Sequence, residues 1–126
     1  MDKDGRTALW WAAYRGRLDC LQLLLRQDGV GVNRPDRSGW TPVYAAAQQG
    51  HTECVVALAA ANADVNQPKK DGWTPLMRAA ICGRLGAVRA LLAAAADPAA
   101  RDAWGTTALE WAQGQGPEEI CGDGGR

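Results

Sequence analysis

Gly72-Trp73-Thr74-Pro75-Leu76 decides how the rest of the chain is read, because a form of this motif occurs four times. Its opening glycines are Gly5, Gly39, Gly72 and Gly105, spaced 34, 33 and 33 residues apart. A second glycine follows each of them by 11 residues, at Gly16, Gly50, Gly83 and Gly116. Two markers that recur in one phase predict a stack of short, similar units.

Each unit is expected to begin with a helix. Thr41 is a good N-cap, because its hydroxyl can accept a hydrogen bond from a free amide, and Pro42 suits the first helical position. Small residues follow at helical spacing, which would let this helix pack closely on its neighbours. That stripe is Leu9, Ala12 and Ala13 in the first unit, Val43, Ala46 and Ala47 in the second, and Leu76, Ala79 and Ala80 in the third.

A second helix is expected after Gly16, Gly50 or Gly83, since glycine can adopt the left-handed conformation that ends a helix. The residues expected to face inward are Cys20, Leu21, Leu24 and Leu25 in the first unit, and Cys54, Val55 and Leu58 in the second. Gly29 and Asn62, two residue types that tolerate positive φ, mark where this helix stops. Ala95 stands at the same place in the third unit, so an alanine must turn left-handed or the turn must change.

These units resemble the ankyrin repeat, whose pattern runs G-x-T-P-L-H-x-A-A, then G-H, then a Val/Leu-rich helix, then G-A-D-V-N. Residues 72–80 and 50–56 match the pattern most closely. The resemblance implies an all-α solenoid of helix-turn-helix units joined by β-turn or hairpin finger loops. It divides a single domain, residues 1–126, into repeats at 3–35, 36–68 and 69–101, a partial fourth at 102–121 and a disordered tail at 122–126.

The chain departs from this pattern at the usual histidine of the first helix. Trp10, Tyr44, Met77 and Glu110 occupy that position, which puts the hydrogen bonds of the histidine in doubt. The first unit also has no unit before it, so Leu9, Ala12 and Ala13 are expected to lie uncovered at the end of the stack.

Composition argues against several kinds of partner and site. Fourteen basic residues balance fourteen acidic ones, so no net field favours nucleic acid or an anionic membrane. Apolar runs such as residues 90–96 are far too short to span a bilayer. Four cysteines without C-x-x-C spacing, and no signal-like leader, predict reduced thiols in the cytoplasm or nucleus.

No constellation predicts catalysis, a metal site or a cofactor. The only serine, Ser38, lies thirteen residues and a helix away from the only histidine, His51, which the resemblance assigns to bracing a helix start. Cys20 and Cys54 repeat on successive helices roughly 8–10 Å apart, too far to share a metal or a disulfide. They are interpreted as core thiols, and Cys82 as a partly exposed one.

The resemblance implies a non-catalytic interaction module, such as a scaffold or adaptor. In ankyrin proteins the finger loops and the exposed side of each first helix form a concave groove that binds another protein or peptide, and the binding residues predicted below are mapped from that pattern. Trp, Tyr and Arg are the types that most often anchor interfaces, and basic loop residues would favour an acidic partner segment. The predicted partner-binding residues are Arg6, Trp11, Tyr14, Arg37, Trp40, Gln48, Lys70, Trp73, Arg78, Ile81, Trp104 and Trp111.

Three alternatives remain open at this point. Trp40 and Trp73 could instead shield the junctions between units. The chain could be a structural spacer that self-associates through its uncovered first unit. Finally, Leu25 with Val32-Asn33 and Leu58 with Val65-Asn66 look like asparagine hydroxylation sites in some ankyrin proteins.

Overall fold

The computed structural model describes residues 3–27, 29–69, 72–100 and 107. These residues form helices and loops, without a strand in the described ranges, which confirms the all-α solenoid. The helices are α1 (Ala8–Arg15), α2 (Leu18–Leu25), α3 (Pro42–Gln49), α4 (Thr52–Ala60), α5 (Pro75–Ile81) and α6 (Leu85–Ala93).

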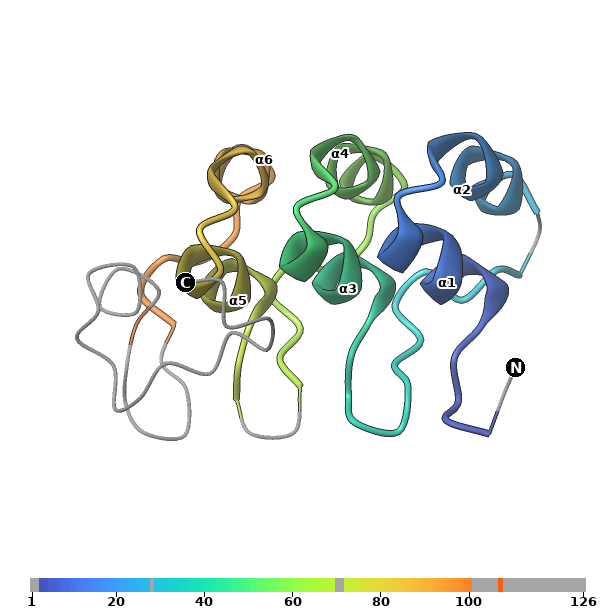
Figure 1. Ribbon diagram of the computed structural model, residues 1–126, viewed down its shortest axis with the longest axis horizontal. Coiled ribbons are helices and arrows are strands. Elements are labelled where there is room, and N and C mark those ends of the chain that lie inside the picture. Colours follow the sequence, from blue (N-terminus) through green and yellow to red (C-terminus); the bar gives the residue numbers. More distant parts are fainter. Residues whose placement is uncertain (1–2, 28, 70–71, 101–106, 108–126) are drawn as a thin grey trace.

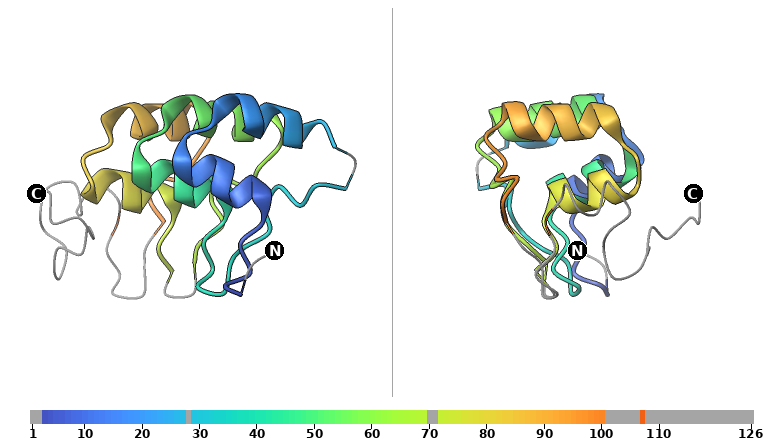
Figure 2. Two further views of the ribbon diagram at one scale, coloured as in Figure 1. Left: turned by 45° about the vertical axis from the view of Figure 1, so that its right-hand side comes forward. Right: turned by 90° about the vertical axis from the view of Figure 1, so that its left-hand side faces the viewer.

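The six helices form two parallel rows (Figure 1). One row contains α1, α3 and α5, and the other contains α2, α4 and α6, so that each unit contributes one helix to each row. Helices pack on their neighbours within a row and on their partner within a unit. The loops between units project away from the helices on one side, as the two turned views show (Figure 2). Each unit is thus buried mainly by the units beside it.

The first helix of each unit begins at a threonine cap, as predicted. The Oγ1 atoms of Thr7, Thr41 and Thr74 accept hydrogen bonds from the backbone N–H three residues later. Pro42 and Pro75 occupy the first turn, where a missing N–H costs nothing.

Glycine is required where α1 and α3 end. Gly16 and Gly50 are left-handed, with φ of 72° and 77°, and their N–H groups bond back to the helix. A Cβ on Gly16 would come within 2.6 Å of the His51 ring, and one on Gly50 within 2.9 Å of Arg84. The same two glycines therefore end a helix and admit a side chain from the next unit.

Two side chains, His51 and Arg84, connect neighbouring units in this way. His51 Nε2 donates to the carbonyl oxygen of Tyr14 at 3.1 Å, and Arg84 Nε donates to the carbonyl oxygen of Gln48 at 2.9 Å. The His51 ring does not cap its own helix. It braces the end of α1 in the unit before, where backbone acceptors lack intrahelical partners.

The second helices are followed by left-handed residues at the predicted positions. Gly29, Asn62 and Ala95 have φ of 77°, 69° and 72°. Ala95 therefore keeps the turn despite its Cβ, at a cost of roughly 1–2 kcal/mol.

The finger loops close by backbone hydrogen bonds rather than regular strands. Asp36 N donates to Trp40 O, and Lys69 N donates to Trp73 O, both at 2.8 Å. Successive loops are also joined, because Asn33 Oδ1 accepts from Asp64 N at 2.7 Å and Asn66 Oδ1 accepts from Asp97 N at 2.6 Å. These bonds hold the loops in register along the stack.

Two burial predictions for the first unit were wrong. Leu9, expected to be uncovered, is only 2% exposed, and Ala12 and Ala13 are buried too. This happens because α1 packs on both α2 and α3 and turns these residues toward them. Cys20, expected in the core, is exposed, whereas its equivalent Cys54 is buried. No helix of an earlier unit covers Cys20 in the part of the chain that the structure describes.

The partial fourth unit and the tail lie outside the described residues, apart from Thr107. Within the described residues, no helix has both the length and the apolar character needed to cross a membrane.

Candidate functional site

The first unit gathers four aromatic side chains, which we call the aromatic cluster: Trp10, Trp11, Tyr14 and Trp40. The first three come from α1 and the fourth from the following finger loop. Trp10 stacks on Tyr14 at 5.1 Å, Trp11 meets Trp10 edge-on at 5.1 Å, and Trp40 lies 6.3 Å from Trp10. Trp11, Tyr14 and Trp40 stay half-buried, so large rigid rings reach the surface here.

Arginines surround the aromatic cluster. Arg6 Cζ lies 4.9 Å from the Trp10 ring and 5.3 Å from the Trp11 ring, and Arg15 Cζ lies 5.1 Å from Trp11. Such cation–π contacts fix the guanidinium groups over the rings. A cavity of about 230 Å³ opens here, lined by Arg6, Trp10, Trp11, Tyr14, Asp36, Ser38 and Trp40.

Asp36 organises the polar side of this cavity. Its Oδ1 accepts from the backbone N–H groups of Ser38 and Trp40, each at 2.9 Å. Its Oδ2 lies 3.7 Å from Arg6 Nε, while Arg6 also pairs with Asp4 at 3.2 Å. Asp36 is buried, and a buried carboxylate needs partners. The two backbone N–H groups and the Arg6 guanidinium supply them.

Sequence reasoning gave Trp10 no part in this site, yet Trp10 lies at its centre. The ring is buried, and its Nε1 donates to the carbonyl oxygen of Trp40 at 3.1 Å. The signal was present in the sequence, because Tyr44 and Met77 at the equivalent position would also be core residues, and both are buried.

The structure brings some of the predicted binding residues onto one face. Arg6, Trp11, Tyr14 and Trp40 line or adjoin the cavity, and Arg37 is exposed on the same finger loop. Gln48 and Ile81 occupy the position of Tyr14 on α3 and α5, and both are half-buried. These residues therefore lie along the row of helices formed by α1, α3 and α5.

The prediction that Trp73 and Arg78 face solvent was wrong. Trp73 has no exposed surface and Arg78 is 7% exposed, and the Arg78 guanidinium lies 5.3 Å from the Trp73 ring. Trp73 thus packs in the core, which matches the alternative that it shields a junction. Trp40, its equivalent, packs on Trp10 and Tyr44 but keeps part of its surface. Lys70, Trp104 and Trp111 lie outside the described residues.

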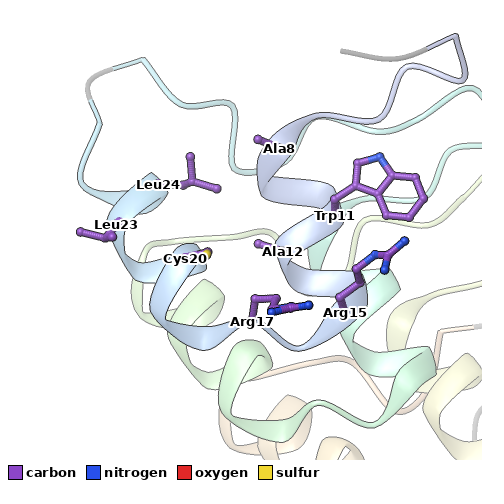
Figure 3. Close-up of a pocket in the computed structure, with 8 residues that line it drawn as sticks. All are labelled: Ala8, Trp11, Ala12, Arg15, Arg17, Cys20, Leu23 and Leu24. Atoms are coloured by element: carbon purple, nitrogen blue, oxygen red, sulfur yellow. The ribbon is translucent and has the colours of Figure 1, made fainter.

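A second hollow lies at the outer end of the first unit (Figure 3). We call it the end groove; it has a volume of about 500 Å³ and is lined by Ala8, Trp11, Ala12, Arg15, Arg17, Cys20, Leu23 and Leu24. Its walls come from α1 and α2, and Leu23 is 59% exposed. The sequence indicated an uncovered end at Leu9, Ala12 and Ala13, and of these three only Ala12 lines the groove.

The cysteines of the described chain have unlike surroundings. Burial, and secondly the charge of Glu53, raises the pKa of the Cys54 thiol, so Cys54 stays protonated. Cys20 is exposed and Cys82 is half-buried, as predicted for Cys82. No group of side chains in the described ranges could hold a metal ion.

Comparison with known proteins places the chain in a family. It is 40% identical over 63 residues to 26S proteasome non-ATPase regulatory subunit 10 of Dictyostelium discoideum, covering 50% of this chain and 27% of that protein. It is 41% identical over 64 residues to ankyrin repeat domain-containing protein 49 of Bos taurus, covering 51% and 27%. Cortactin-binding protein 2 of Ornithorhynchus anatinus is 40% identical over 57 residues, which span 45% of this chain and 4% of that protein.

These three relatives have unlike names. The matched region spans only 27% of the length of each of the first two proteins and 4% of the length of the third. What they share with this chain is the repeat itself. The family model for ankyrin repeats matches three times, at residues 1–69, 31–102 and 62–122. Ankyrin repeats generally mediate protein–protein interaction and are typically non-catalytic, and this chain belongs to the ankyrin repeat family.

Proposed function

We propose that this domain is the recognition segment of a larger protein or assembly. It binds a segment of another protein along the row of helices formed by α1, α3 and α5. The observation that carries the proposal is the aromatic cluster with its arginines. Trp11, Tyr14 and Trp40 offer rigid apolar surface, which is what interface anchors provide. Gln48 and Ile81 would extend this surface along α3 and α5.

Local charge supports an acidic partner segment. Arg15 and Arg37 are exposed beside the aromatic cluster; of the two nearby acids, Asp36 is buried and bonded to its own loop, and exposed Asp4 pairs with Arg6. Opposite charge on the partner would speed association and fix its register. Arg6, which pairs with Asp4 and Asp36, would contribute mainly by holding the rings in place.

The test is quantitative affinity capture with matched variants. The double variant Trp11→Ala/Tyr14→Ala removes two half-buried rings, and Val56→Ala/Leu92→Ala removes two exposed apolar side chains from the other row of helices. We expect the first variant to lose the captured partner and the second to keep it, with helical circular dichroism unchanged in both. Equal capture by the two variants would contradict the proposal.

Two further expectations remain proposals. Asparagine hydroxylation would act on Asn33 or Asn66, whose Oδ1 atoms both accept bonds from the next loop. Mass spectrometry without added oxygen on either residue in cells would argue against it. A reducing cytoplasmic or nuclear setting is proposed from the thiols, and cell fractionation would test it.

A further inference from the structure

The cavity beside the aromatic cluster lies at a junction between two described units. Its walls come from the first unit, mainly α1, and from the finger loop that begins the second unit. Hydrogen bonds join the two walls, because Trp10 Nε1 donates to the Trp40 carbonyl oxygen at 3.1 Å and Arg37 N donates to the Asp4 carbonyl oxygen at 2.8 Å. This cavity is therefore bounded on both sides by the described chain, whereas the end groove is not.

Asp36 keeps one carboxylate oxygen for a ligand in this cavity. Its Oδ1 is taken by the backbone N–H groups of Ser38 and Trp40. Its Oδ2 lies 3.7 Å from Arg6 Nε, which balances the charge but is too long for a hydrogen bond. The Asp36 side chain is only 4% exposed, and Oδ2 accepts no hydrogen bond from the residues that the structure describes. A ligand that displaces water from Oδ2 must therefore supply a donor or lose affinity.

The size and walls of the cavity select for one aromatic side chain. Its volume of about 230 Å³ lies below the roughly 300–1,000 Å³ of pockets for drug-sized molecules. The four rings of the aromatic cluster line it, and rings pack favourably against another ring, edge-on or offset. Combined with the acceptor on Asp36, this favours an aromatic side chain that carries a hydrogen-bond donor at its tip.

Charge around the cavity favours a neutral side chain. The Arg6 guanidinium already lies over the rings of Trp10 and Trp11. It also pairs with Asp4 and Asp36, so a lysine or arginine of a partner would meet a like charge there. A carboxylate or phosphate would instead meet the Asp36 carboxylate. A phenol hydroxyl avoids both conflicts and can donate to Oδ2.

We propose that this cavity receives a tyrosine side chain of the partner segment, whose hydroxyl donates a hydrogen bond to Asp36 Oδ2 while its ring packs among the aromatic cluster. This inference rests on the proposed function and names the side chain that the concave surface recognises. The two tyrosines of this sequence are otherwise engaged, because Tyr14 stacks on Trp10 in the wall of the cavity and Tyr44 has no exposed surface. The occupant therefore comes from a partner rather than from a second copy of the chain.

The test is an NMR titration of the full chain with two small probes. These are N-acetyl-tyrosinamide and N-acetyl-phenylalaninamide, which differ only by the hydroxyl group. The indole N–H signals of Trp10 and Trp40 report on the cavity, and that of Trp73, fully buried outside it, is the internal control. We expect saturable shifts with the tyrosine amide and about tenfold weaker binding of the phenylalanine amide, because a phenyl ring leaves Oδ2 without a donor.

A matched pair of variants assigns this preference to Asp36. Asp36→Asn keeps an oxygen for the loop N–H groups but replaces the free oxygen with NH₂. We expect the preference for tyrosine over phenylalanine to fall to about twofold or less, while binding of the phenylalanine amide stays the same. Asp64→Asn is the control, because Asp64 Oδ1 accepts a similar loop bond from Asn66 N at 3.0 Å and Asp64 does not line the cavity. The titration of the natural chain tests the proposal even if Asp36→Asn fails to fold.

Several outcomes would overturn the proposal. These are no saturable shift with the tyrosine amide, equal binding of the two probes, or an Asp36→Asn variant that keeps the preference. Tighter binding of N-acetyl-lysinamide would make the cavity a cation site, and tighter binding of the phosphotyrosine amide would make it an anion site at Arg6. If capture of the partner still required Trp11 and Tyr14 while the probes bound equally, this inference would fail and the proposed function would stand. If the probes differed but capture did not require those rings, the proposed function would fail instead.

Discussion

The first and second units show how a neighbouring unit changes the burial of equivalent residues. Leu24 and Cys20 are matched in type and position by Leu58 and Cys54, yet the first pair lines an open groove and the second pair is buried. The sequence of the helix is not what differs, since α2 and α4 are both apolar on the same face. Whether a residue is buried in this fold therefore depends on the unit that packs beside it, as expected for a quasi-one-dimensional stack.

The two regions also differ in what their inner helices carry. The first unit has Trp11 where the second has Ala45, and Trp11 is half-buried whereas Ala45 is fully buried. Large rings at the end of the stack meet solvent, and small residues in the middle allow close packing. The first unit therefore keeps accessible aromatic surface at a position where the second unit is closely packed.

The largest expected effect is that of Trp73→Ala. The ring is fully buried, and removing a buried Trp side chain costs about 3–5 kcal/mol of unfolding free energy. Trp11→Ala removes a half-buried ring of the first unit and should cost much less. Urea denaturation of both variants measures the difference. Similar losses would mean that the first unit is as tightly packed as the junctions.

Leu58→Ala and Leu24→Ala compare one position in the two units. Leu58 is fully buried, so its truncation should cost about 2–5 kcal/mol. Leu24 is half-buried beside the end groove and should lose a smaller amount. Thermal and urea unfolding give both values. If Leu24→Ala cost as much as Leu58→Ala, the end groove would be closed in solution.

The hydrogen bonds between units give a smaller contrast. His51→Ala removes the bond to the Tyr14 carbonyl and should cost about 0.5–1.5 kcal/mol. Arg17→Ala, at the equivalent exposed position, should leave the free energy of unfolding nearly unchanged. The same denaturation assay detects both changes. An equal loss in Arg17→Ala would show that Arg17 already braces another part of the chain.

The fold could be predicted from the sequence because its signals are local and repeated. The caps at Thr7, Thr41 and Thr74 follow from hydrogen bonds within one turn, and the left-handed turns at Gly29 and Asn62 follow from residue type and period. At Ala95 only the period favoured a left-handed turn, and residue type argued against it. The caps and the turns at Gly29 and Asn62 were visible without knowing which units were neighbours.

The candidate site was only partly predictable because exposure depends on contacts between units. Trp40 and Trp73 are the same residue in the same motif, but one is half-buried and the other fully buried. The burial of Leu9 depends on how α1 is rotated against α2 and α3. The bond from Trp10 to Trp40 joins residues thirty positions apart, and no local pattern indicates it.

The reactivity of the cysteines compares the two units without any substitution. Cys20 is exposed and its equivalent Cys54 is buried, with a pKa raised by that burial and by Glu53. The thiolate is the reactive form, so iodoacetamide should modify Cys20 quickly and Cys54 only slowly in the folded protein, with both reacting after unfolding in urea. Peptide mass spectrometry over a time course measures the two rates. Equal rates in the folded protein would show that the junction between α2 and α4 opens easily, and the contrast between the first and second units would then disappear.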